Sequence, residues 1–537
     1  MPVVETKIDP SSEAFRQNRA DMLAEIDKLR AIEGKVRETE ARARDKFHKR
    51  GQLLPRERVA LLLDRGSPFL ELSTLCGLRY HDDSDGSLAG GNTIVGIGYV
   101  SGVRALVVAN NAAIKGGTMS PWGVQKTLRA QKIALENKLP VVVLVESGGA
   151  NLLYQQEIFV PGGEAFYNQA RLSAAGIPQI CVVHGSSTAG GAYLPGLSDY
   201  VIMVRNKAKV FLAGPPLLKA ATGEIATDED LGGAEMHCQV AGTAELLAED
   251  DADGVRIARE VLAKLGWARI EGGRQGDGRA PRYSPDELCG VVPVDYRKPY
   301  DCREVIARIV DGSEFLEFKA LYDGQLVCGR AEIDGHPVGL IGNNGPITER
   351  GSVKAAQFIQ LCCQADVPIV YLQNITGYMV GTKAEQAGIV KHGSKMIQAV
   401  ANATVPQLTV VIGASFGAGN YGMCGRGFGP RFIFAWPNSR TAVMGGEQAA
   451  RVMSIVMGEK MARQGNPVPE SVLMEMAQPI IDQFDKESHA WNCSARLFDD
   501  GLIDPRDTRR VLALTLSICR ESRVRELSPS TFGVARM

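Results

Sequence analysis

The sequence repeats itself across its two halves, and this constrains the fold more than any other feature. The string "RERVALLLD-x-GS-x-FLEL" (56–72) returns as "REVIARIVDGSEFLEF" (303–318), and "PQICVVHGSSTAGGAY" (178–193) returns as "PQLTVVIGASFGAGNY" (406–421). Between them, "PVVVLVESGG" returns as "PIVYLQNITG". Because the order is the same in both halves, we expect one fold used twice. Two copies provide two similar pockets, which suit two ligands that react with each other.

Length and composition set the broad class. A chain of 537 residues with 45% apolar and 23% charged residues is typical of globular protein, and the repeat indicates two units. The net charge of −1 gives no sign of a nucleic-acid partner. No apolar stretch approaches the roughly 20 residues that span a bilayer, and the N-terminus lacks a secretory layout. We therefore expect a cytoplasmic protein that does not span a membrane.

The composition along the chain predicts three segments. Residues 1–50 are rich in Glu, Arg, Lys and Ala, which predicts a charged helical arm. The Gly-rich, polar stretch 270–285 is the best linker candidate. It separates a first domain (51–285) from a second (286–537).

Short β-branched runs alternate with helix-like segments in each half. Examples are 141–145 and 180–183 in the first half and 369–372 and 408–412 in the second. Strands that alternate with helices predict parallel β/α layering, and continuous apolar strands suit sheets that are covered on both faces. Each half is therefore expected to be a layered α/β domain.

A glycine-rich turn follows the same strand in both halves and precedes a predicted helix. The alignment places Gly190 on Ala418, Gly191 on Gly419 and Tyr193 on Tyr421. Such a turn exposes backbone N–H groups at the positive end of a helix dipole, where glycine lets a ligand approach closely. These donors suit a developing enolate oxygen. The competing interpretation is that the glycines serve only the close packing of a tight turn. The occurrence of the turn at matching positions in both halves makes this interpretation less favoured.

Other chemistry is weakly signalled. Gly413-Ala-Ser415-Phe-Gly417 matches the hydrolase nucleophile elbow, but no triad partner stands downstream. The seven histidines do not cluster, and the eleven cysteines include no C-x-x-C pair, so no metal site is predicted. The absence of a side-chain base suggests a reaction in which a substrate carries its own base.

Long motifs in this chain resemble one enzyme family. They are "SGGAN", "TAGGAY", "FLAGPPL-x-KAATGE", "LGGAE-x-HC", "LQNITGYMVG", "GNYGMCGR", "VMGGEQAA" and "DDG-x-IDP-x-DTR". They resemble the carboxyltransferase β subunit of biotin-dependent acyl-CoA carboxylases, in the methylcrotonyl-CoA and geranyl-CoA carboxylase branch. The resemblance runs from about residue 15 to the C-terminus. It implies two tandem crotonase-like (β-β-α superhelix) domains, the first for acyl-CoA and the second for carboxybiotin.

The resemblance also implies roles for individual residues. Gly190 and Gly191 would donate to the thioester enolate oxygen, and Ala418 and Gly419 would donate to the biotin ureido oxygen. Carboxybiotin would release CO2, the biotin enolate would remove the γ-proton, and the dienolate would attack CO2. Other expected acyl-CoA-binding residues are Gly148, Gly149, Ala150, Leu152, Gly162, Phe166, Tyr193 and Lys115, the last for the CoA phosphates. Expected biotin-binding residues are Thr376, Gly377 and Tyr421.

The resemblance further implies partners. The chain has no "M-K-M" biotin-attachment motif and no ATP-grasp-like stretch, so biotin would come on a biotin carboxylase/biotin carrier α subunit. A hexameric β core in an α6β6 assembly is expected, with active sites shared between protomers.

The acyl pocket departs from the methylcrotonyl pattern. After "SGGAN" the chain reads "LLYQQEIFVPGGEAFYNQ", which is shorter than the methylcrotonyl segment and has Gly162 where that family has Phe. The absence of a phenyl ring opens space for a longer acyl chain. Each methylene of that chain that becomes buried would stabilise binding by about 0.8 kcal/mol. Leu152, Leu153, Ile158 and Phe159 are candidate lining residues. Geranyl-CoA is favoured as substrate over methylcrotonyl-CoA.

Two further classes of function remain open at this point. A single-site crotonase-type hydratase, isomerase or thioesterase would need catalytic carboxylates in the first half, and a related decarboxylase shares these motifs. A non-catalytic assembly core would predict decay of at least one glycine turn, yet both are intact.

Overall fold

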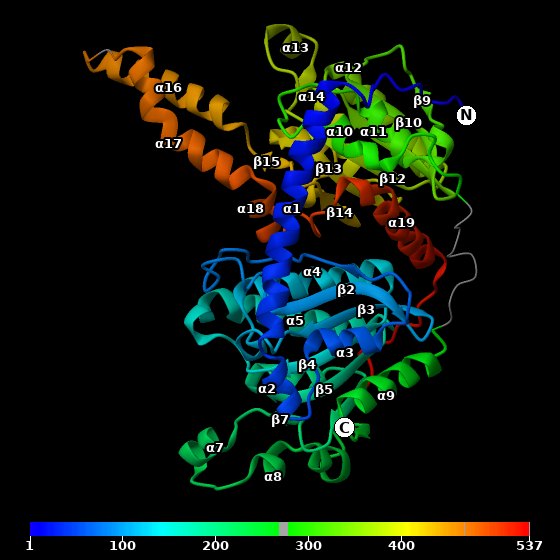
Figure 1. The fold of residues 1–537 in the computed structure, drawn as a ribbon, viewed down its shortest axis with the longest axis vertical. Coiled ribbons are helices and arrows are strands. Elements are labelled where there is room, and N and C mark those ends of the chain that lie inside the picture. The colour runs from blue at the N-terminus through cyan, green and yellow to red at the C-terminus, as the bar shows by residue number, and fades with distance from the viewer. Residues whose placement is uncertain (268–277, 467, 536–537) are drawn as a thin grey trace. The chain divides into compact units, whose positions relative to one another are not determined.

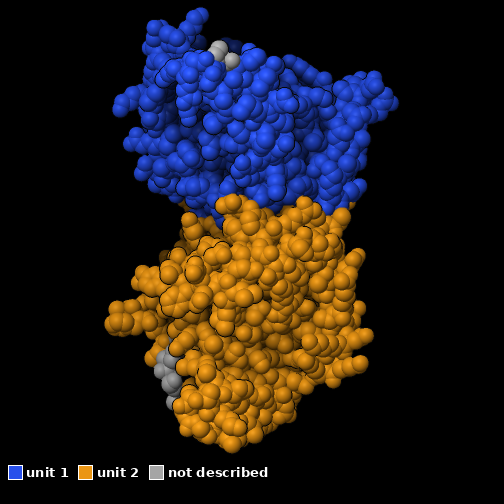
Figure 2. Space-filling model, turned by 90° about the vertical axis from the view of Figure 1, so that its left-hand side faces the viewer, with its two compact units in different colours: residues 1–29, 274–494, 498–517 blue, residues 30–273, 495–497, 518–537 orange. Residues whose placement is uncertain are grey.

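The computed structural model describes residues 1–267, 278–466 and 468–535, and these fall into two compact units. Unit 1 comprises Met1–Leu29, Arg274–Ser494 and Phe498–Ser517, and unit 2 comprises Arg30–Gly273, Ala495–Leu497 and Ile518–Met537 (Figure 2). Each unit combines a long central segment with shorter pieces from elsewhere in the chain. The expected linker lies partly outside the described residues.

Unit 2 is built on an eight-stranded mixed sheet (Figure 1). Its order is β1-β2-β3-β4-β5-β6-β8, with β7 paired to β5. The strands are β1 (Leu70–Glu71), β2 (Thr93–Val100), β3 (Val103–Asn110), β4 (Val141–Ser147), β5 (Gln179–Thr188), β6 (Tyr200–Val204), β7 (Lys209–Phe211) and β8 (Leu246–Ala248). The pairs from β3 onward are parallel, as expected. The pairs β1-β2 and β2-β3 are antiparallel, which the expected parallel layering did not include.

Unit 1 contains a seven-stranded sheet of the same design. Its order is β14-β13-β12-β11-β10-β9, with β15 paired to β13. The strands are β9 (Leu316–Phe318), β10 (Leu326–Ile333), β11 (His336–Asn343), β12 (Ile369–Ile375), β13 (Gln407–Phe416), β14 (Phe432–Ala435) and β15 (Arg440–Ala442). The pairing register slips at matching places, between Val145 and Ser147 in unit 2 and between Gln373 and Ile375 in unit 1. The two units are copies of one α/β fold, which confirms the predicted duplication.

The first repeated motif explains the antiparallel part of each sheet. Tight two-residue turns close the hairpins β2-β3 and β10-β11, and both turn residues have positive φ in Ser101–Gly102 and in Asp334–Gly335. Turns of this conformation match the twist of antiparallel strands. Asp64 accepts both N–H groups of the first turn at 2.8 and 2.7 Å, and Asp311 accepts both of the second at 2.8 Å.

The same motif supplies an ion pair in each unit. Arg56 binds Glu71 through two hydrogen bonds of 2.9 Å, and Arg303 binds Glu317 through two of 2.8 and 2.6 Å. Two-point pairing fixes geometry as well as charge. The repeated sequence motif therefore gives both units the same Arg–Glu ion pair between a helix and the first strand of the sheet.

Helices bury the sheets. In unit 2, α3 (Pro55–Leu62) and α9 (Asp251–Lys264) pack on the strands through a cluster that includes Leu62 and Leu262. In unit 1, α12 (Glu349–Gln364) and α14 (Ile389–Ala401) do so through Phe358 and Met396. These clusters are the cores that hold the carboxyl ends of the parallel strands in place.

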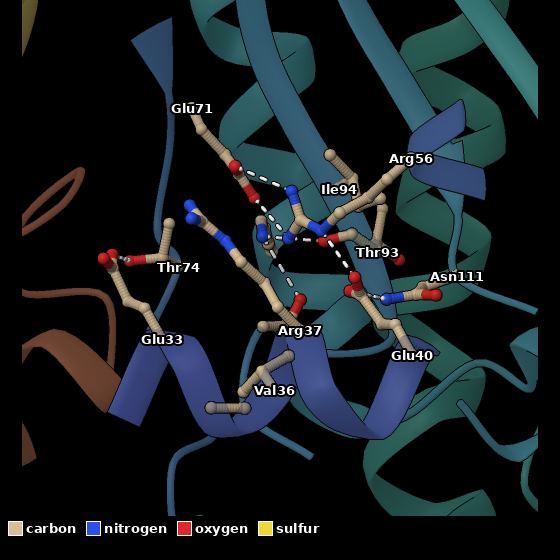
Figure 3. Close-up of a pocket in the computed structure, with 13 residues that line it drawn as sticks. Glu33, Val36, Arg37, Glu40, Arg56, Glu71, Thr74, Thr93, Ile94 and Asn111 are labelled. Carbon is tan, nitrogen blue, oxygen red and sulfur yellow. Dashed lines mark hydrogen bonds and ion pairs between the residues drawn. The ribbon is translucent and has the colours of Figure 1, made fainter. Parts of the chain in front are cut away.

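The N-terminal arm is helical, and it is less exposed than its composition suggests. Helix α1 (Glu13–Ala41) buries one stripe, including Met22 and Ile26. Its C-terminal part lies over a small, charged cavity of unit 2 (Figure 3). There Arg56 also binds Glu40 at 2.6 Å, which in turn accepts from Asn111 at 2.5 Å. The ion pairs of Arg56 with Glu40 and Glu71 therefore connect the C-terminal part of α1 to α3 and β1.

The two units differ in the helices that come after β7 and β15. Unit 2 continues with the short helices α7 (Pro215–Thr222) and α8 (Asp228–Gly232), whereas unit 1 continues with a long helical hairpin of α16 (Gly446–Arg463) and α17 (Glu470–Ser488) (Figure 1). Helix α16 exposes several large apolar side chains, among them Val452, Met453, Ile455 and Val456.

Candidate active site

The two glycine turns have the same backbone path. In unit 2, β5 ends at Thr188 and a 3-10 turn (Ala189–Ala192) leads into α6 (Tyr193–Gly196). In unit 1, β13 ends at Phe416 and α15 (Gly417–Gly422) follows. Each turn begins with a left-handed residue, Ala189 at φ 52° and Gly417 at φ 56°. A left-handed alanine is strained by about 1–2 kcal/mol, so surrounding structure holds it there.

The space around each turn shows whether its glycines are needed for close packing or leave room for a ligand. A Cβ on Gly190 would meet only Phe166 Cζ at 4.0 Å, and one on Gly191 would make ordinary contact with Ser187 Oγ at 3.5 Å. Neither residue has a positive φ, so packing in the described chain does not require glycine at either place. At Gly419 a Cβ would lie 2.6 Å from Ile375 Cγ1. Packing therefore explains the glycine at position 419. At Gly190 the structure leaves space on the exposed side of the turn, which we call the open cradle.

Exposure follows the same pattern in both turns. Gly190 and Ala418 are exposed, whereas the next residue in each turn, Gly191 or Gly419, is buried. The first N–H groups of a helical segment lack partners within it, so they are available to a ligand from the exposed side. The residues that the alignment paired therefore take matching places.

A second loop lies beside each turn, after β4 and after β12. Gly149 has φ 83° and its carbonyl accepts the Met119 N–H at 2.8 Å, while Gly377 has φ 129° and accepts from Ile347 at 3.0 Å. Ser147 Oγ lies 3.7 Å from where a Cβ of Gly191 would be, which places the loop against the turn. Gly148 and Ala150 belong to this loop, Ala150 bridging to Met119, and Thr376 is exposed in the loop of unit 1.

Aromatic side chains border both turns. The rings of Phe166, from α5 (Gln155–Ala174), and Tyr193 lie 5.7 Å apart at 60°. In unit 1, Tyr421 stacks on Phe428 at 5.6 Å. Both tyrosines are about half exposed, at 47% and 49%. The structure thus places the Phe166 ring beside both Gly190 and Tyr193, and the roles of these residues in acyl-CoA binding stay a prediction.

The predicted acyl-chain residues divide into two groups. Gly162 lies one helical turn before Phe166, and a Cβ there would meet only Ile158 Cγ2 at 4.0 Å. Ile158 itself is buried, and its role in lining the acyl pocket stays a prediction. Leu152 and Phe159 are about four-fifths exposed and remain free to contact a ligand.

Lys115 is already paired. Its ammonium lies 2.6 Å from Asp82 Oδ2, and Tyr154 donates to the other oxygen of that carboxylate at 2.7 Å. The hydrogen bond from Lys115 lowers the pKa of Asp82, so this carboxyl group is ionised near neutral pH. The lysine occupies the short 3-10 turn Lys115–Gly117, whose Gly116 carbonyl accepts the Gly148 N–H at 3.2 Å.

A buried charged network behind the turn was missed by sequence reasoning. His184 Nδ1 lies 2.9 Å from Asp251, which accepts from Arg58 at 2.9 Å, and Arg58 binds Glu146 at 2.7 Å. Burial lowers the pKa of His184 to about 4, so the imidazole is neutral near pH 7. Its four members come from α3, β4, β5 and α9. They lie far apart in the sequence, so no local motif predicts the network.

Ser415 is not placed as a nucleophile. Its buried hydroxyl donates to Gln373 at 2.5 Å and accepts from Asn420 at 2.7 Å. In the described ranges no group of three or more His, Cys, Asp or Glu side chains is arranged to hold a metal ion. None of the described helices combines the length and apolarity needed to cross a membrane.

Comparison with known proteins identifies the family. Residues 46–534 match the carboxyl transferase domain. The chain belongs to the carboxyl transferase family. It is 48% identical to the probable biotin-dependent acyl-coenzyme A carboxylase β2 subunit of Mycobacterium tuberculosis, covering all of both chains. It is 46% identical to the probable mitochondrial methylcrotonoyl-CoA carboxylase β chain of Drosophila melanogaster, covering 100% of this chain and 95% of the relative.

A solved structure agrees with this placement. The β subunit of geranyl-CoA carboxylase from P. aeruginosa is 59% identical, covers all of both chains and superposes with a TM-score of 0.93. The predicted membership of the carboxyltransferase β subunits in this branch and the predicted pair of crotonase-like domains are confirmed. This carboxyltransferase is a component of a biotin-dependent acyl-CoA carboxylase.

Proposed function

We propose that this carboxyltransferase moves the carboxyl group of carboxybiotin to the γ-carbon of geranyl-CoA. The observation that carries the proposal is the pair of matching turns, one of which leaves an open cradle at Gly190. The proposed reaction forms a biotin enolate on loss of CO2 and then a thioester dienolate on removal of the γ-proton, so it needs two donor sets, one for each oxygen. A turn kept only for packing would have no reason to leave space for a Cβ.

Each turn has its own task in this proposal. The N–H groups of Gly190 and Gly191 hold the thioester oxygen as charge develops on it, and those of Ala418 and Gly419 hold the ureido oxygen of biotin. Preorganised donors of this kind are worth about 2.7–4 kcal/mol each in related chemistry. Biotin supplies CO2 and the base that removes the γ-proton. The chain's own contribution is orientation, oxyanion stabilisation and exclusion of water.

The geranyl preference rests on Gly162. Gly162 is buried one turn of α5 before Phe166, and an added Cβ there would meet only Ile158 Cγ2 at 4.0 Å. The methylcrotonyl-type subunits that the sequence resembles carry Phe here. The extra isoprene unit of a geranyl chain adds apolar surface that gains about 0.8 kcal/mol per buried methylene. The identity of 59% to a geranyl-CoA carboxylase β subunit supports the same assignment.

A hydratase or isomerase of the crotonase type is less well supported. It needs a free carboxylate beside the thioester, and Glu146, which precedes the Gly148–Gly149 loop, is bound by Arg58 and by Gln52. Methylcrotonyl-CoA carboxylation remains the alternative within the family, supported by 46% identity to a methylcrotonoyl-CoA carboxylase β chain.

The proposal includes partners. We expect biotin to arrive on a biotin carboxylase/carrier α subunit and the β subunit to form a hexameric core in an α6β6 assembly. The acyl-CoA half is the first domain (51–285) and the carboxybiotin half is the second (286–537). Exposed apolar residues on α16, such as Ile455 and Val456, fit burial by another subunit. All eleven cysteines are free, which fits a reducing cytoplasm.

A carboxylation assay tests the function. The purified chain is combined with its biotin-carrying partner, ATP and bicarbonate, and kcat/KM is compared for geranyl-CoA and methylcrotonyl-CoA. We expect geranyl-CoA to be carboxylated more efficiently. A higher kcat/KM for methylcrotonyl-CoA would overturn the substrate assignment, and no turnover of either would overturn the function.

A further inference from the structure

A buried serine lies at the same place before each glycine turn. Ser187 is the last residue but one of β5, and Ser415 is the last residue but one of β13. Both serines are fully buried, and neither hydroxyl group takes part in the proposed chemistry. Burying a hydroxyl group costs free energy unless the group is hydrogen-bonded, so its partners show which part of the structure it holds.

The sheets hold the backbone of both serines from two sides. Ser187 is paired with Ser147 of β4 and, at its other edge, with β7. Ser415 is paired with Ile375 of β12 and, at its other edge, with β15. Both pairs come directly after the place where the register slips in each sheet. Each hydroxyl group therefore starts from a fixed position, from which it can restrain a neighbouring segment.

Ser187 restrains the acyl-CoA turn directly. Its hydroxyl group donates to the Gly191 carbonyl at 2.8 Å. Gly191 is one of the two proposed donors to the thioester oxygen, and a glycine has the widest range of backbone angles of any residue. The hydrogen bond to its carbonyl restricts the ψ angle of Gly191, so that the residue and its N–H group keep one orientation.

Ser415 restrains the carboxybiotin turn through two side chains. Its hydroxyl group donates to Gln373 Oε1 at 2.5 Å and accepts from Asn420 Nδ2 at 2.7 Å. Asn420 comes directly after Gly419, inside α15. Gln373 Nε2 in turn donates at 2.6 Å to the carbonyl of Met423, the residue that follows α15. The hydrogen-bonded chain of Gln373, Ser415 and Asn420 therefore holds α15 at two points.

The two units differ in the neighbours of the serine. The alignment of the turns places Val145 and Ala192 of unit 2 where unit 1 has Gln373 and Asn420. Neither apolar side chain can form a hydrogen bond, so in unit 2 the serine binds the turn itself. In unit 1 the serine links two polar side chains, and its removal takes a hydrogen-bond partner away from each of them.

We propose that Ser187 and Ser415 are positioning residues, each of which aligns the N–H donors of its own turn for one half of the reaction. This rests on the proposed function, in which the turn of unit 2 binds the thioester oxygen and the turn of unit 1 binds the biotin oxygen. The donors must be in place before charge develops, because a small displacement loses much of their effect. The serine of the G-x-S-x-G match at 413–417 thus supports the turn by hydrogen bonds.

Two activities of the carboxylase, assembled with its biotin-carrying partner, test the two halves separately. The first is the loss of CO2 from the carboxylated partner when no acyl-CoA is present, which needs only the turn of unit 1. The second is the carboxylation of geranyl-CoA, which needs both turns. We expect Ser415→Ala to slow both activities about tenfold. We expect Ser187→Ala to slow only the carboxylation about tenfold, through kcat and not KM, because an aligned donor acts on the developing charge.

Thr515→Val is the matched control. It removes a fully buried hydroxyl group of unit 1 that donates to backbone carbonyls of its own helix, and it leaves both activities unchanged. Asn420→Ala breaks the hydrogen-bonded chain at its other end and decides the question if Ser415→Ala does not fold. Because Ser415 and Asn420 act through one hydrogen bond, the double variant is no slower than Ser415→Ala. Thermal unfolding shows whether each variant is folded.

Three results would overturn the proposal. The first is CO2 loss at the wild-type rate in Ser415→Ala. The second is carboxylation at the wild-type rate in Ser187→Ala. The third is an equal slowing of CO2 loss in both variants, which would show that the serines only support the fold. A wild-type carboxylase that loses CO2 without acyl-CoA but does not carboxylate geranyl-CoA would reject the proposed function, and CO2 loss in Ser415→Ala would still test the serine.

Discussion

A methyl group added at Gly190 finds open space, whereas one added at Gly419 overlaps Ile375. The two residues look alike in the sequence, since each lies in a glycine turn after a buried strand. Only the surrounding atoms distinguish a glycine that admits a ligand from a glycine that admits a neighbouring side chain. Substitutions at the two positions therefore separate the two explanations.

We expect Gly190→Ala to fold normally and to lose activity. Its methyl group occupies the open side of the turn, so the thioester oxygen no longer reaches the N–H groups, and kcat falls about a hundredfold. Gly419→Ala instead destabilises the fold by about 1–3 kcal/mol, because its Cβ has no room. Thermal unfolding and the carboxylation assay measure both effects. Unfolding of Gly190→Ala at a clearly lower temperature would contradict the open cradle.

Gly162→Phe is expected to act on chain length. The added ring fills the space beside Ile158 and Phe166, so kcat/KM for geranyl-CoA falls about tenfold or more while that for methylcrotonyl-CoA is retained. The control is Gly163→Phe, at the neighbouring exposed position, where a Cβ would meet no atom within 4 Å. Equal losses on the two substrates would mean that Gly162 does not select chain length.

At the scale of elements, the network of His184, Asp251, Arg58 and Glu146 joins four segments behind the acyl-CoA turn. Burial alone would raise the pKa of Asp251, but hydrogen bonds from His184 and the charge of Arg58 bring it below its usual value. In unit 1 the position that matches Glu146 is occupied by Asn374, whose side-chain oxygen accepts the Ala414 N–H at 3.1 Å. Unit 2 therefore has a charged side chain where unit 1 has a neutral amide.

Asp251→Ala is expected to destabilise the chain by about 3–5 kcal/mol. It removes the acceptor of His184, Arg58 and the Leu53 N–H, and leaves Arg58 buried with one carboxylate. Asp253→Ala, which breaks the exposed pair with Arg256, costs at most about 1 kcal/mol and serves as control. Denaturant unfolding measures the difference, and similar losses in the two variants would show that the network contributes little.

The parallel core of each unit was predictable, because its apolar runs coincide with β4, β5, β12 and β13. Strand β2 was not, since Gly96 and Gly98 disfavour a strand by propensity. The structure explains them: a Cβ on Gly96 would lie 2.3 Å from the Phe69 ring. Likewise the glycine turns were found from their repetition, whereas the His184 network joins residues far apart in sequence and could be found only in the fold.

At the scale of the whole molecule, one buried carboxyl makes stability depend on pH. Burial raises the pKa of Asp499 to about 7, although Ser494 and the Gly501 N–H donate to it at 2.8 and 2.9 Å. In the unfolded chain its pKa is near the ordinary 3.8. The folded state therefore holds a proton that the unfolded state releases. The stability that this proton provides is lost as the pH rises from about 4 to 7.

Asp499→Asn is expected to remove that dependence. The amide accepts the same hydrogen bonds without a charge, so the variant is more stable than wild type at pH 8, by up to about 4 kcal/mol, and similar to it near pH 4. Thermal unfolding across this range measures the gap. A gap that stays constant with pH would show that Asp499 is ionised throughout.

The division of the chain between the two units has a consequence for biosynthesis. Unit 1 contains the first 29 residues and unit 2 contains the last 20, Ile518–Met537. Residues 1–29 therefore belong with residues synthesised more than 200 positions later, and unit 2 includes the last residues of α19 (Thr508–Val524). Domains usually fold as they emerge, N-terminal first. Here each unit combines segments that lie far apart in the sequence, so neither unit can finish folding before both of its segments have been synthesised.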